Sequence, residues 1–356
     1  MRLFAKNTSS LSGQVNCPGD KSISQRAIII GALANQNISI SGFLNGEDPL
    51  STLSALNQIG ADISINDNRV NIKKREIPFS NSSNSIDLGN SGTGMRLMMG
   101  LIAGIGLKAK LIGDESLMKR PMSRVSIPLN EMGANVSNSD GLPPIEIESR
   151  EIRDEYVYDM PIASAQVKSS ILLAGVASST KVSIFEPSIT RDHTELMLKH
   201  FGLNIKSEEE NDGKRITFTP GKNFLVQDYF VVGDFSSAAF LIIAGLIASD
   251  SAISIKNVGL NPTRSGLIDI LIQMGGNIEI KNKKMLSGEL VGDVFVKSSV
   301  LSGVNINGGI ISNIIDEIPI LSIAAACANG ITRISDAQEL RVKESDRLEA
   351  IGSGLS

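Results

Sequence analysis

The chain of 356 residues has no tryptophan, two histidines and two cysteines. Cys17 and Cys327 form no CxxC pair, and no His, Cys and carboxylate cluster has zinc-site spacing, so we expect a reducing compartment and no metal. No apolar run could span a bilayer, and the N-terminus lacks a hydrophobic signal core. The net charge of −4 gives no basic field of the kind that nucleic-acid-binding proteins carry. These absences favour a cytoplasmic protein without metal, membrane or nucleic-acid partners.

The composition is that of a globular protein, with 42% apolar and 20% charged residues. The length predicts about two domains. Because the chain as a whole is slightly acidic, an anionic ligand must be held by local groups of basic residues.

One pattern recurs along the chain: a small polar cluster, an apolar helical run, a Gly/Ala-rich stop and a β-branched strand. Its copies begin 70 to 82 residues apart, at Asp20, Asn90, Ser164, Asp234 and Asp316. A second pattern interleaves with it, in which amphipathic helices close on a glycine that suits the left-handed residue at a helix end. These glycines are Gly60, Gly133, Gly202 and Gly275.

Each closing glycine is followed by alternating segments around a polar turn, which predicts a β-hairpin. The predicted turns are residues 66–69, 138–141, 208–213 and 281–284. Each unit of about 70 residues therefore reads strand, helix, strand, helix, hairpin, which indicates an α/β fold with several units per domain. Two domains of three units would need six starts, and the sixth would fall beyond Ser356. We expect the chain to end about one repeat early.

The unit starts are rich in helix N-capping residues, and the first turn of a helix attracts anions. Capping alone would explain any single start. Cations nevertheless gather near them, where they oppose the helix dipole unless a phosphate or carboxylate is bound. They are Lys21, Arg26, Arg120, Arg124, Arg191, Arg341, Lys343 and Arg347.

Two carboxylates are candidates for proton transfer, Asp316 and Glu344. Asp316 is also a good N-cap, and that is its likelier role on the residues alone. Lys343, Glu344 and Arg347 would share one face of a helix, although an ordinary exposed ion pair between the first two is an alternative. A carboxylate beside basic residues should have a lowered pKa and be ready to accept a proton.

Several motifs resemble those of the 5-enolpyruvylshikimate-3-phosphate (EPSP) synthase family: PGDKSISQRA from Pro18, LGNSGTGMRL from Leu88, GDESLMKRPM from Gly113 and RVKESDRL from Arg341. The resemblance covers essentially the whole chain. It implies a two-domain enolpyruvyl transferase fold, an inside-out α/β barrel built from βαβαββ repeats, here with the last repeat missing. Residues 1–17 would belong with the second domain, 18–229 would form the first domain, and 230–356 an incomplete second domain.

The resemblance also implies the reaction, in which the enolpyruvyl group of phosphoenolpyruvate passes to the 5-hydroxyl of shikimate-3-phosphate and phosphate is released. This is a transferase step of the shikimate pathway, which leads through chorismate to aromatic amino acids, and it needs no cofactor. A monomer is usual for such a fold.

Individual positions take the roles of the matching family residues. On the shikimate-3-phosphate side these are Lys21, Ser22, Arg26, Ser164, Gln166 and Lys343, and Arg191 matches a further substrate-site position. On the phosphoenolpyruvate side they are Lys21, Gly92, Arg120, Gln166 and Arg347, with Asn90 capping the same turn. Asp316 would take the hydroxyl proton and Glu344 would protonate C3, so that Lys21, Asp316 and Glu344 are the predicted catalytic residues.

Some family features are absent. Gln25 stands where a histidine is common, and the later Asp-His-Arg motif and a near-C-terminal lysine lie beyond the end of the chain. We therefore expect this polypeptide by itself to be inactive or nearly so. One alternative is a non-catalytic anion-binding remnant or fragment. Another is the transferase acting on UDP-N-acetylglucosamine, which carries a reactive cysteine where GDESLMKRPM has none.

Overall fold

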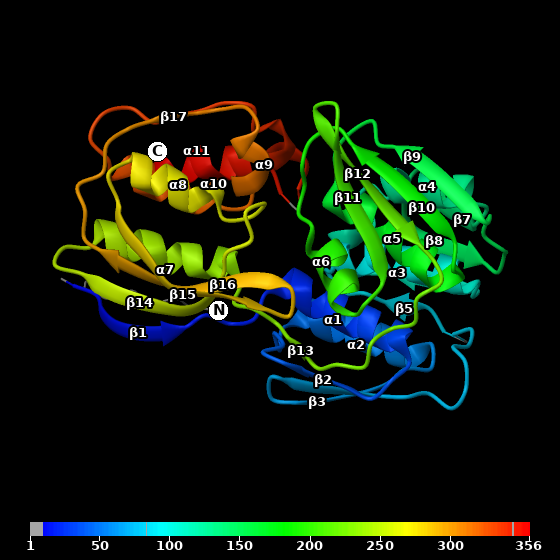
Figure 1. Ribbon diagram of the computed structural model, residues 1–356. Helices are drawn as coiled ribbons and strands as arrows, with labels where there is room; N and C mark the ends of the chain where they lie inside the picture. Colours follow the sequence, from blue (N-terminus) through cyan, green and yellow to red (C-terminus); the bar gives the residue numbers. More distant parts are fainter. Residues whose placement is uncertain (1–9, 83, 344) are drawn as a thin grey trace. The chain divides into compact units, whose positions relative to one another are not determined.

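The computed structural model describes residues 10–82, 84–343 and 345–356, which divide into two compact units. The N-unit comprises Gly19–Val231. The C-unit comprises the described residues up to Pro18 together with Val232–Ser356. Figure 1 labels the helices and strands of both units.

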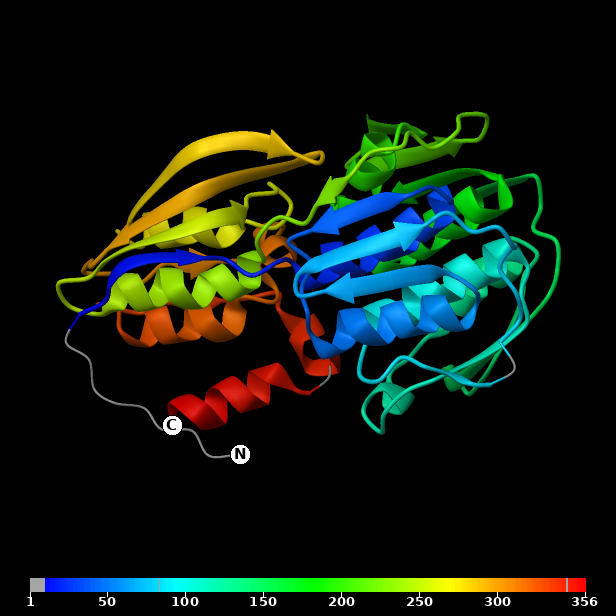
Figure 2. The ribbon, with the colours of Figure 1, turned by 90° about the horizontal axis from the view of Figure 1, so that it is seen from below.

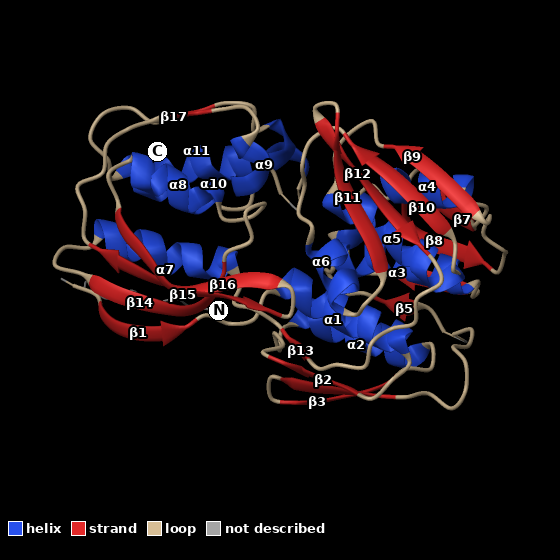
Figure 3. Ribbon diagram, in the orientation of Figure 1, coloured by secondary structure: helices blue, strands red, loops and turns tan. Residues whose placement is uncertain are grey.

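The N-unit contains three sheets of four strands, each associated with two α-helices (Figure 3). Its helices are α1 (Lys21–Ala34), α2 (Glu47–Gln58), α3 (Gly92–Ile105), η1 (Leu117–Lys119), α4 (Ser123–Glu131), α5 (Ala165–Ser178) and α6 (His193–His200). Its strands are β2 (Ile38–Ser41), β3 (Asp62–Asn66), β4 (Arg69–Lys73), β5 (Ile86–Asp87), β6 (Ala109–Ile112), β7 (Asn135–Ser139), β8 (Leu142–Glu148), β9 (Glu155–Asp159), β10 (Lys181–Glu186), β11 (Asn204–Glu210), β12 (Gly213–Thr219) and β13 (Tyr229–Phe230).

The three sheets share one topology, with orders β13-β2-β4-β3, β5-β6-β8-β7 and β11-β12-β10-β9. In each, a parallel pair is joined to an antiparallel hairpin. The second and third repeats of the N-unit therefore have the order strand, helix, strand, helix, hairpin, as the sequence predicts. The first repeat takes its first strand, β13, from the end of the N-unit, and its sheet lies beside α1 and α2 (Figure 2).

The C-unit repeats this topology once in the sheet β1-β14-β16-β15 and adds a two-stranded parallel sheet, β17-β18. Its helices are α7 (Phe235–Ile247), α8 (Gly266–Gln273), α9 (Ile310–Ile314), α10 (Ile318–Ala326), η2 (Gln338–Val342) and α11 (Arg347–Leu355). Its strands are β1 (Ser12–Asn16), β14 (Ala252–Gly259), β15 (Asn277–Leu286), β16 (Glu289–Lys297), β17 (Asn305–Ile306) and β18 (Arg333–Ile334). Strand β1 pairs in parallel with β14, so the N-terminal strand completes a sheet of the C-unit.

Helices α1, α3 and α5 form the interior of the N-unit. Each presents small and apolar residues on almost every side, and nearly the whole of its middle is buried. A helix that is apolar all round requires burial on all sides. The strands instead alternate buried and exposed positions, as in β4, so each sheet turns one face to this interior. The inner helices are thereby fixed in place, and with them their N-terminal turns.

The predicted helix ends are confirmed. Gly60, Gly133, Gly202 and Gly275 have φ angles of 99°, 108°, 81° and 95°. The predicted turn at residues 281–284 is wrong, because β15 continues through it with a bulge between Lys281 and Lys284. The chain reverses at Ser287 and Gly288, whose φ angles of 50° and 85° suit a two-residue hairpin turn. None of the helices in the described part of the chain has the length and apolar character needed to cross a membrane.

Candidate active site

The first turns of α1, α3 and α5 are joined by buried or half-buried hydrogen bonds. The Gln25 side-chain amide of α1 donates to Ser91 Oγ at 2.7 Å, and Ser91 caps α3 by accepting from the amide of Gly94. The Gln166 amide, in the first turn of α5, donates to Thr93 Oγ1 in the first turn of α3 at 2.8 Å. The N-termini of three helices, with their exposed N–H groups and positive dipole ends, therefore gather in one place.

Five predicted site residues lie in the first turns of the three helices or at their caps: Lys21, Ser22, Gly92, Ser164 and Gln166. Two more lie next to them, since Arg26 is in the second turn of α1 and Asn90 directly precedes the cap of α3. Ser164 caps α5 through the amide of Val167. Gln25 differs from the histidine common in the family motif, and here its amide is one of the groups that join α1 to α3.

Arg120 lies against the start of α3. Its guanidinium donates to the Asn90 carbonyl, to the Asn90 side-chain oxygen and to Ser116 Oγ. The Asn90 side-chain amide in turn donates to Asp114, and this hydrogen bond is the main reason that the pKa of Asp114 is lowered. The prediction that Asn90 caps the turn is wrong, because Ser91 is the cap and the Asn90 side chain holds Arg120 instead.

A further cation, Arg96, escaped the sequence analysis. It lies one turn into α3 and donates to the carbonyls of Gly92 and Pro121 at 3.1 and 3.2 Å. Burial, together with the charges of Arg120 and Arg124, lowers its pKa to about 10. Arg96 and Arg120 thus adjoin the N-terminus of one helix, and the charge of Arg124 acts on Arg96, which concentrates positive potential at a place suited to a phosphate or carboxylate. The signal was available in the sequence, since Arg96 lies within the motif LGNSGTGMRL.

Two of the residues predicted to bind substrate interact with other side chains of the protein in this structure. The Lys21 ammonium pairs with Asp48 at 2.9 Å, with half of the lysine side chain exposed. Arg26 is buried, and its guanidinium donates to Thr194 Oγ1, Ser169 Oγ and the Ser22 carbonyl. Arg26 therefore links α1 to α5 and α6.

Arg191 is not in the first turn of one of these helices; it lies in the loop between β10 and α6.

The predicted residues of the C-unit centre on Asp316. The Asp316 carboxylate pairs with Arg347 at 3.1 Å and lies 3.7 Å from Arg264. The buried Arg264 also binds both oxygens of the buried Glu317, at 3.0 and 3.3 Å, and donates to Ser236 Oγ. This arginine, absent from the predicted set, joins the N-terminal ends of α7 and α10.

Two local expectations in the C-unit are wrong. Asp316 does not cap α10, because the residue at the cap position is Glu317 and Asp316 pairs with arginine instead. Lys343 and Arg347 do not share a helical face, since Lys343 is extended and α11 begins only at Arg347. Glu344 lies outside the described residues.

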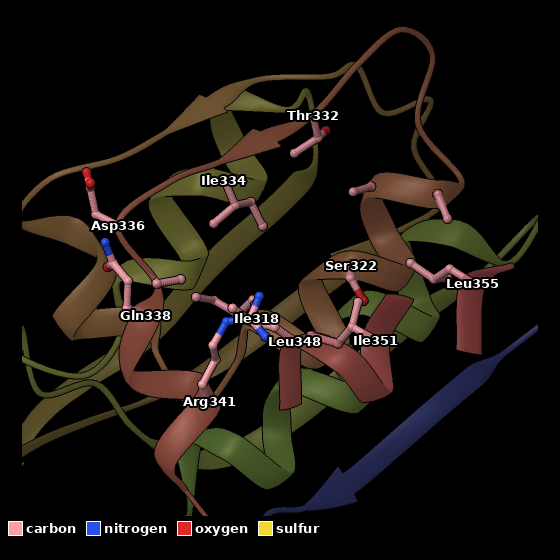
Figure 4. Close-up of a pocket in the computed structure, with 13 residues that line it drawn as sticks. Ile318, Ser322, Thr332, Ile334, Asp336, Gln338, Arg341, Leu348, Ile351 and Leu355 are labelled. Atoms are coloured by element: carbon pink, nitrogen blue, oxygen red, sulfur yellow. The ribbon is translucent and has the colours of Figure 1, made fainter. Parts of the chain in front are cut away.

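The C-unit also contains a pocket of about 620 Å³ between α10, α11 and the segment around η2 (Figure 4). Ile318, Ile334, Leu348 and Ile351 line it, and Arg341 points into it from η2. Its lining contains none of the predicted catalytic or substrate-binding residues, so this mainly apolar pocket is separate from the carboxylate and arginine cluster around Asp316.

Comparisons with known proteins agree with this architecture. The fold resembles the enolpyruvyl transferase NikO from Streptomyces tendae, with a TM-score of 0.65, 17% identity and coverage of 91% of this chain and 74% of that one. At that identity the likeness concerns the fold alone. EPSP synthase from Acinetobacter baumannii superposes with a TM-score of 0.84 at 40% identity, covering 96% of this chain and 77% of that one. The expected fold, that of the two-domain enolpyruvyl transferases, is confirmed.

Sequence comparison specifies the family. A family model described as EPSP synthase (3-phosphoshikimate 1-carboxyvinyltransferase) matches residues 5–356. Proteins named 3-phosphoshikimate 1-carboxyvinyltransferase are 43% identical over the whole chain in Thermoanaerobacter sp. (strain X514) and 46% identical over 99% of it in Petrotoga mobilis. The chain spans 83% and 82% of the lengths of these two relatives. The chain belongs to the EPSP synthase family, and the two alternative functions are not favoured.

Proposed function

We propose that this chain carries the residues that bind shikimate-3-phosphate and phosphoenolpyruvate and that serve the transfer of the enolpyruvyl group of the second to the 5-hydroxyl of the first. The observation that carries the proposal is the joining of three helix N-termini beside Arg96 and Arg120. Such a site stabilises two anionic reactants without any further ion. The family to which the chain belongs supports the same reaction.

In this proposal each unit contributes its own residues to the reaction. Residues of the N-unit hold the anionic groups: Lys21, Ser22, Arg26, Ser164, Gln166 and Arg191 on the shikimate-3-phosphate side, and Lys21, Gly92, Gln166 and Arg120, itself held by Asn90, on the phosphoenolpyruvate side. The half-exposed Lys21 ammonium, paired with Asp48 here, exchanges this partner for a ligand oxygen. In the C-unit, Lys343 helps to hold shikimate-3-phosphate, and Arg347, which pairs with Asp316 here, contacts phosphoenolpyruvate.

The reaction has two steps. The 5-oxygen forms a bond to C2 of phosphoenolpyruvate while Asp316 accepts the hydroxyl proton and Glu344 gives a proton to C3. In the second step the bond from C2 to the phosphate oxygen breaks, phosphate leaves with the bonding electrons and takes up the proton held by Asp316, and C3 returns a proton to the Glu344 carboxylate to restore the double bond. Arginines near Asp316 favour its ionised form, which is the form that accepts the proton.

Binding and turnover of the purified chain test the proposal. Shikimate-3-phosphate would be titrated by calorimetry, alone and with phosphoenolpyruvate, and phosphate release would be followed in the same samples. Arg120→Gln should weaken phosphoenolpyruvate binding about tenfold to a hundredfold, because a charge-assisted contact is lost. Lys119→Gln is the matched control, since Lys119 is 70% exposed and pairs only with the neighbouring Glu115. Equal phosphoenolpyruvate affinity in the two variants would contradict the proposal. So would a failure of the unmodified chain to bind shikimate-3-phosphate.

A further inference from the structure

A buried ion cluster lies beneath the loop that carries Arg191. Lys168, on α5, has a fully buried side chain whose ammonium lies 2.8 Å from Glu186 and 2.7 Å from Glu195. Both carboxylates are also buried, with side chains 1% and 3% exposed. Their charges raise the pKa of Lys168 although burial, the largest effect, would lower it, so the lysine is an ammonium.

The two carboxylates are the two ends of one loop. Glu186 is the last residue of β10, and Glu195 lies in the first turn of α6, so residues 187–192 are bracketed by partners of the same ammonium. Within the loop, Thr190 donates its hydroxyl to Glu186 at 2.7 Å. The loop is exposed above this base: Ile189 is 49% exposed, and Arg191 is partly exposed.

A second set of buried contacts fixes the same junction. Ser169, next to Lys168, lies 2.7 Å from Thr194 through their hydroxyls, and Arg26 donates to both. Residues 168 and 169 of α5 thus hold residues 194 and 195 of α6. Burial of this cluster costs free energy, because three charged groups are removed from water. In addition, one oxygen of Glu195 has no hydrogen-bond partner among the described residues.

We propose that Lys168 is a positioning residue, which holds both ends of the 187–192 loop and thereby places Arg191 to receive shikimate-3-phosphate. This rests on the proposed function, in which Arg191 contacts that substrate. A buried ion pair contributes little net stability against apolar groups of the same size, so its value lies in fixing one conformation. Anchoring both ends of a short exposed loop on a rigid inner helix restricts the loop in this way and lowers the entropic cost of binding.

The test compares the unmodified chain with the neutral variant Lys168→Met/Glu186→Gln/Glu195→Gln, which leaves no unpaired buried charge. We expect the variant to fold, with unchanged circular dichroism. Amide hydrogens in residues 188–192 should exchange about tenfold faster, and shikimate-3-phosphate should bind about tenfold more weakly because Arg191 is misplaced. The control is Lys181→Gln/Glu155→Gln, which removes an ion pair between β10 and β9 whose side chains are half exposed, and should change neither quantity.

A thermodynamic cycle separates positioning from general loosening. Arg191→Ala should weaken binding in the unmodified chain but add little to the loss already present in the neutral variant. Unchanged loop exchange and affinity in the neutral variant would overturn the inference. If Arg191→Ala leaves affinity unchanged while the loop exchanges faster in the neutral variant, the role of Arg191 in the proposed function has failed and Lys168 only holds the loop.

A milder variant covers the case in which the neutral variant does not fold. Glu195→Gln keeps the pair between Lys168 and Glu186 and releases only the second end of the loop. Faster exchange confined to residues at that end, with a smaller loss of affinity, would support the inference. Exchange equal to that of the unmodified chain would overturn it.

Discussion

Gly92 and Arg120 are so close that a Cβ atom at residue 92 would lie 3.0 Å from Nη1 of Arg120. The same Cβ would lie 3.0 Å from Nη1 of Arg96. The helix α3 begins at Gly92, so the absence of a side chain there lets two guanidinium groups approach the helix N-terminus. The glycine of the motif LGNSGTGMRL therefore leaves the room that the positively charged groups of the site occupy.

Gly92→Ala should therefore change ligand binding more than stability. The atoms in contact are the far ends of flexible arginines, which can move by a few tenths of an ångström without disturbing the backbone. We expect the melting temperature to change by no more than about 2 °C. Phosphoenolpyruvate affinity, measured by calorimetry with shikimate-3-phosphate present, should fall about tenfold because both guanidinium groups shift. Unchanged affinity would show that the ligand does not use this helix N-terminus.

Arg96 should decrease stability while it promotes anion binding. Its pKa in the folded protein is lowered to about 10, so the folded state holds this proton less tightly than the unfolded state. Below pH 10 both states are protonated and the full cost of the buried charge applies; as the pH rises above 10, this group's contribution to stability increases. Arg96→Met should consequently raise the free energy of unfolding at pH 7 by roughly 1–2 kcal/mol.

The same variant should bind phosphoenolpyruvate more weakly, since a cation beside the helix N-terminus is lost. In the unmodified chain a bound anion would restore the pKa of Arg96, so binding near pH 10 should take up protons that Arg96→Met does not take up. Calorimetry in two buffers of different ionisation enthalpy measures this uptake. Equal proton uptake by the two proteins would exclude a ligand beside Arg96.

Much of this site follows from the sequence because it depends on local structure. The N-caps Asp20, Ser164 and Asp234 and the closing glycines are properties of single helix ends, which short motifs specify. The repeat placed these ends in equivalent positions of successive units. The hydrogen bonds that join them, such as Gln166 to Thr93, are long-range, and the sequence predicts only that the ends are alike.

The residues that sequence analysis missed act through distant partners. Arg264 lies in the motif LNPTRSG, yet its role depends on Glu317, which is 53 residues further on. Lys168 is the only charged residue of α5, and nothing near it in the chain shows that its charge is buried. Asp316 looked like a helix cap because its neighbours form a helix, but the nearby arginines provide a stronger interaction for its carboxylate. Tertiary contacts, which have no local signal, decide these cases.

Arg264→Met should destabilise the C-unit strongly. The Glu317 side chain is fully buried, and removal of its arginine leaves a carboxylate without a countercharge. We expect a loss of about 3–5 kcal/mol in urea unfolding. Arg264→Met combined with Glu317→Gln should recover most of it, because no unpaired charge remains. Arg341→Gln is the control, since this arginine is 59% exposed and should cost less than about 0.5 kcal/mol. Similar losses for Arg264→Met and Arg341→Gln would contradict this account of the cluster.

Gly100 tests whether the spacing of α3 and α5 sets the site. A Cβ atom at residue 100 would lie 2.1 Å from the Ser170 carbonyl oxygen, which is backbone and cannot move without its helix. Gly100→Ala should therefore separate the two helices and cost roughly 2–4 kcal/mol in urea unfolding. Separation also lengthens the hydrogen bond between Gln166 and Thr93, so shikimate-3-phosphate affinity should fall in parallel. Gly352→Ala is the control, because a Cβ there meets nothing within 4 Å and alanine favours the helix. If Gly100→Ala loses stability but keeps full affinity, the first turns of α3 and α5 do not act together on the substrate.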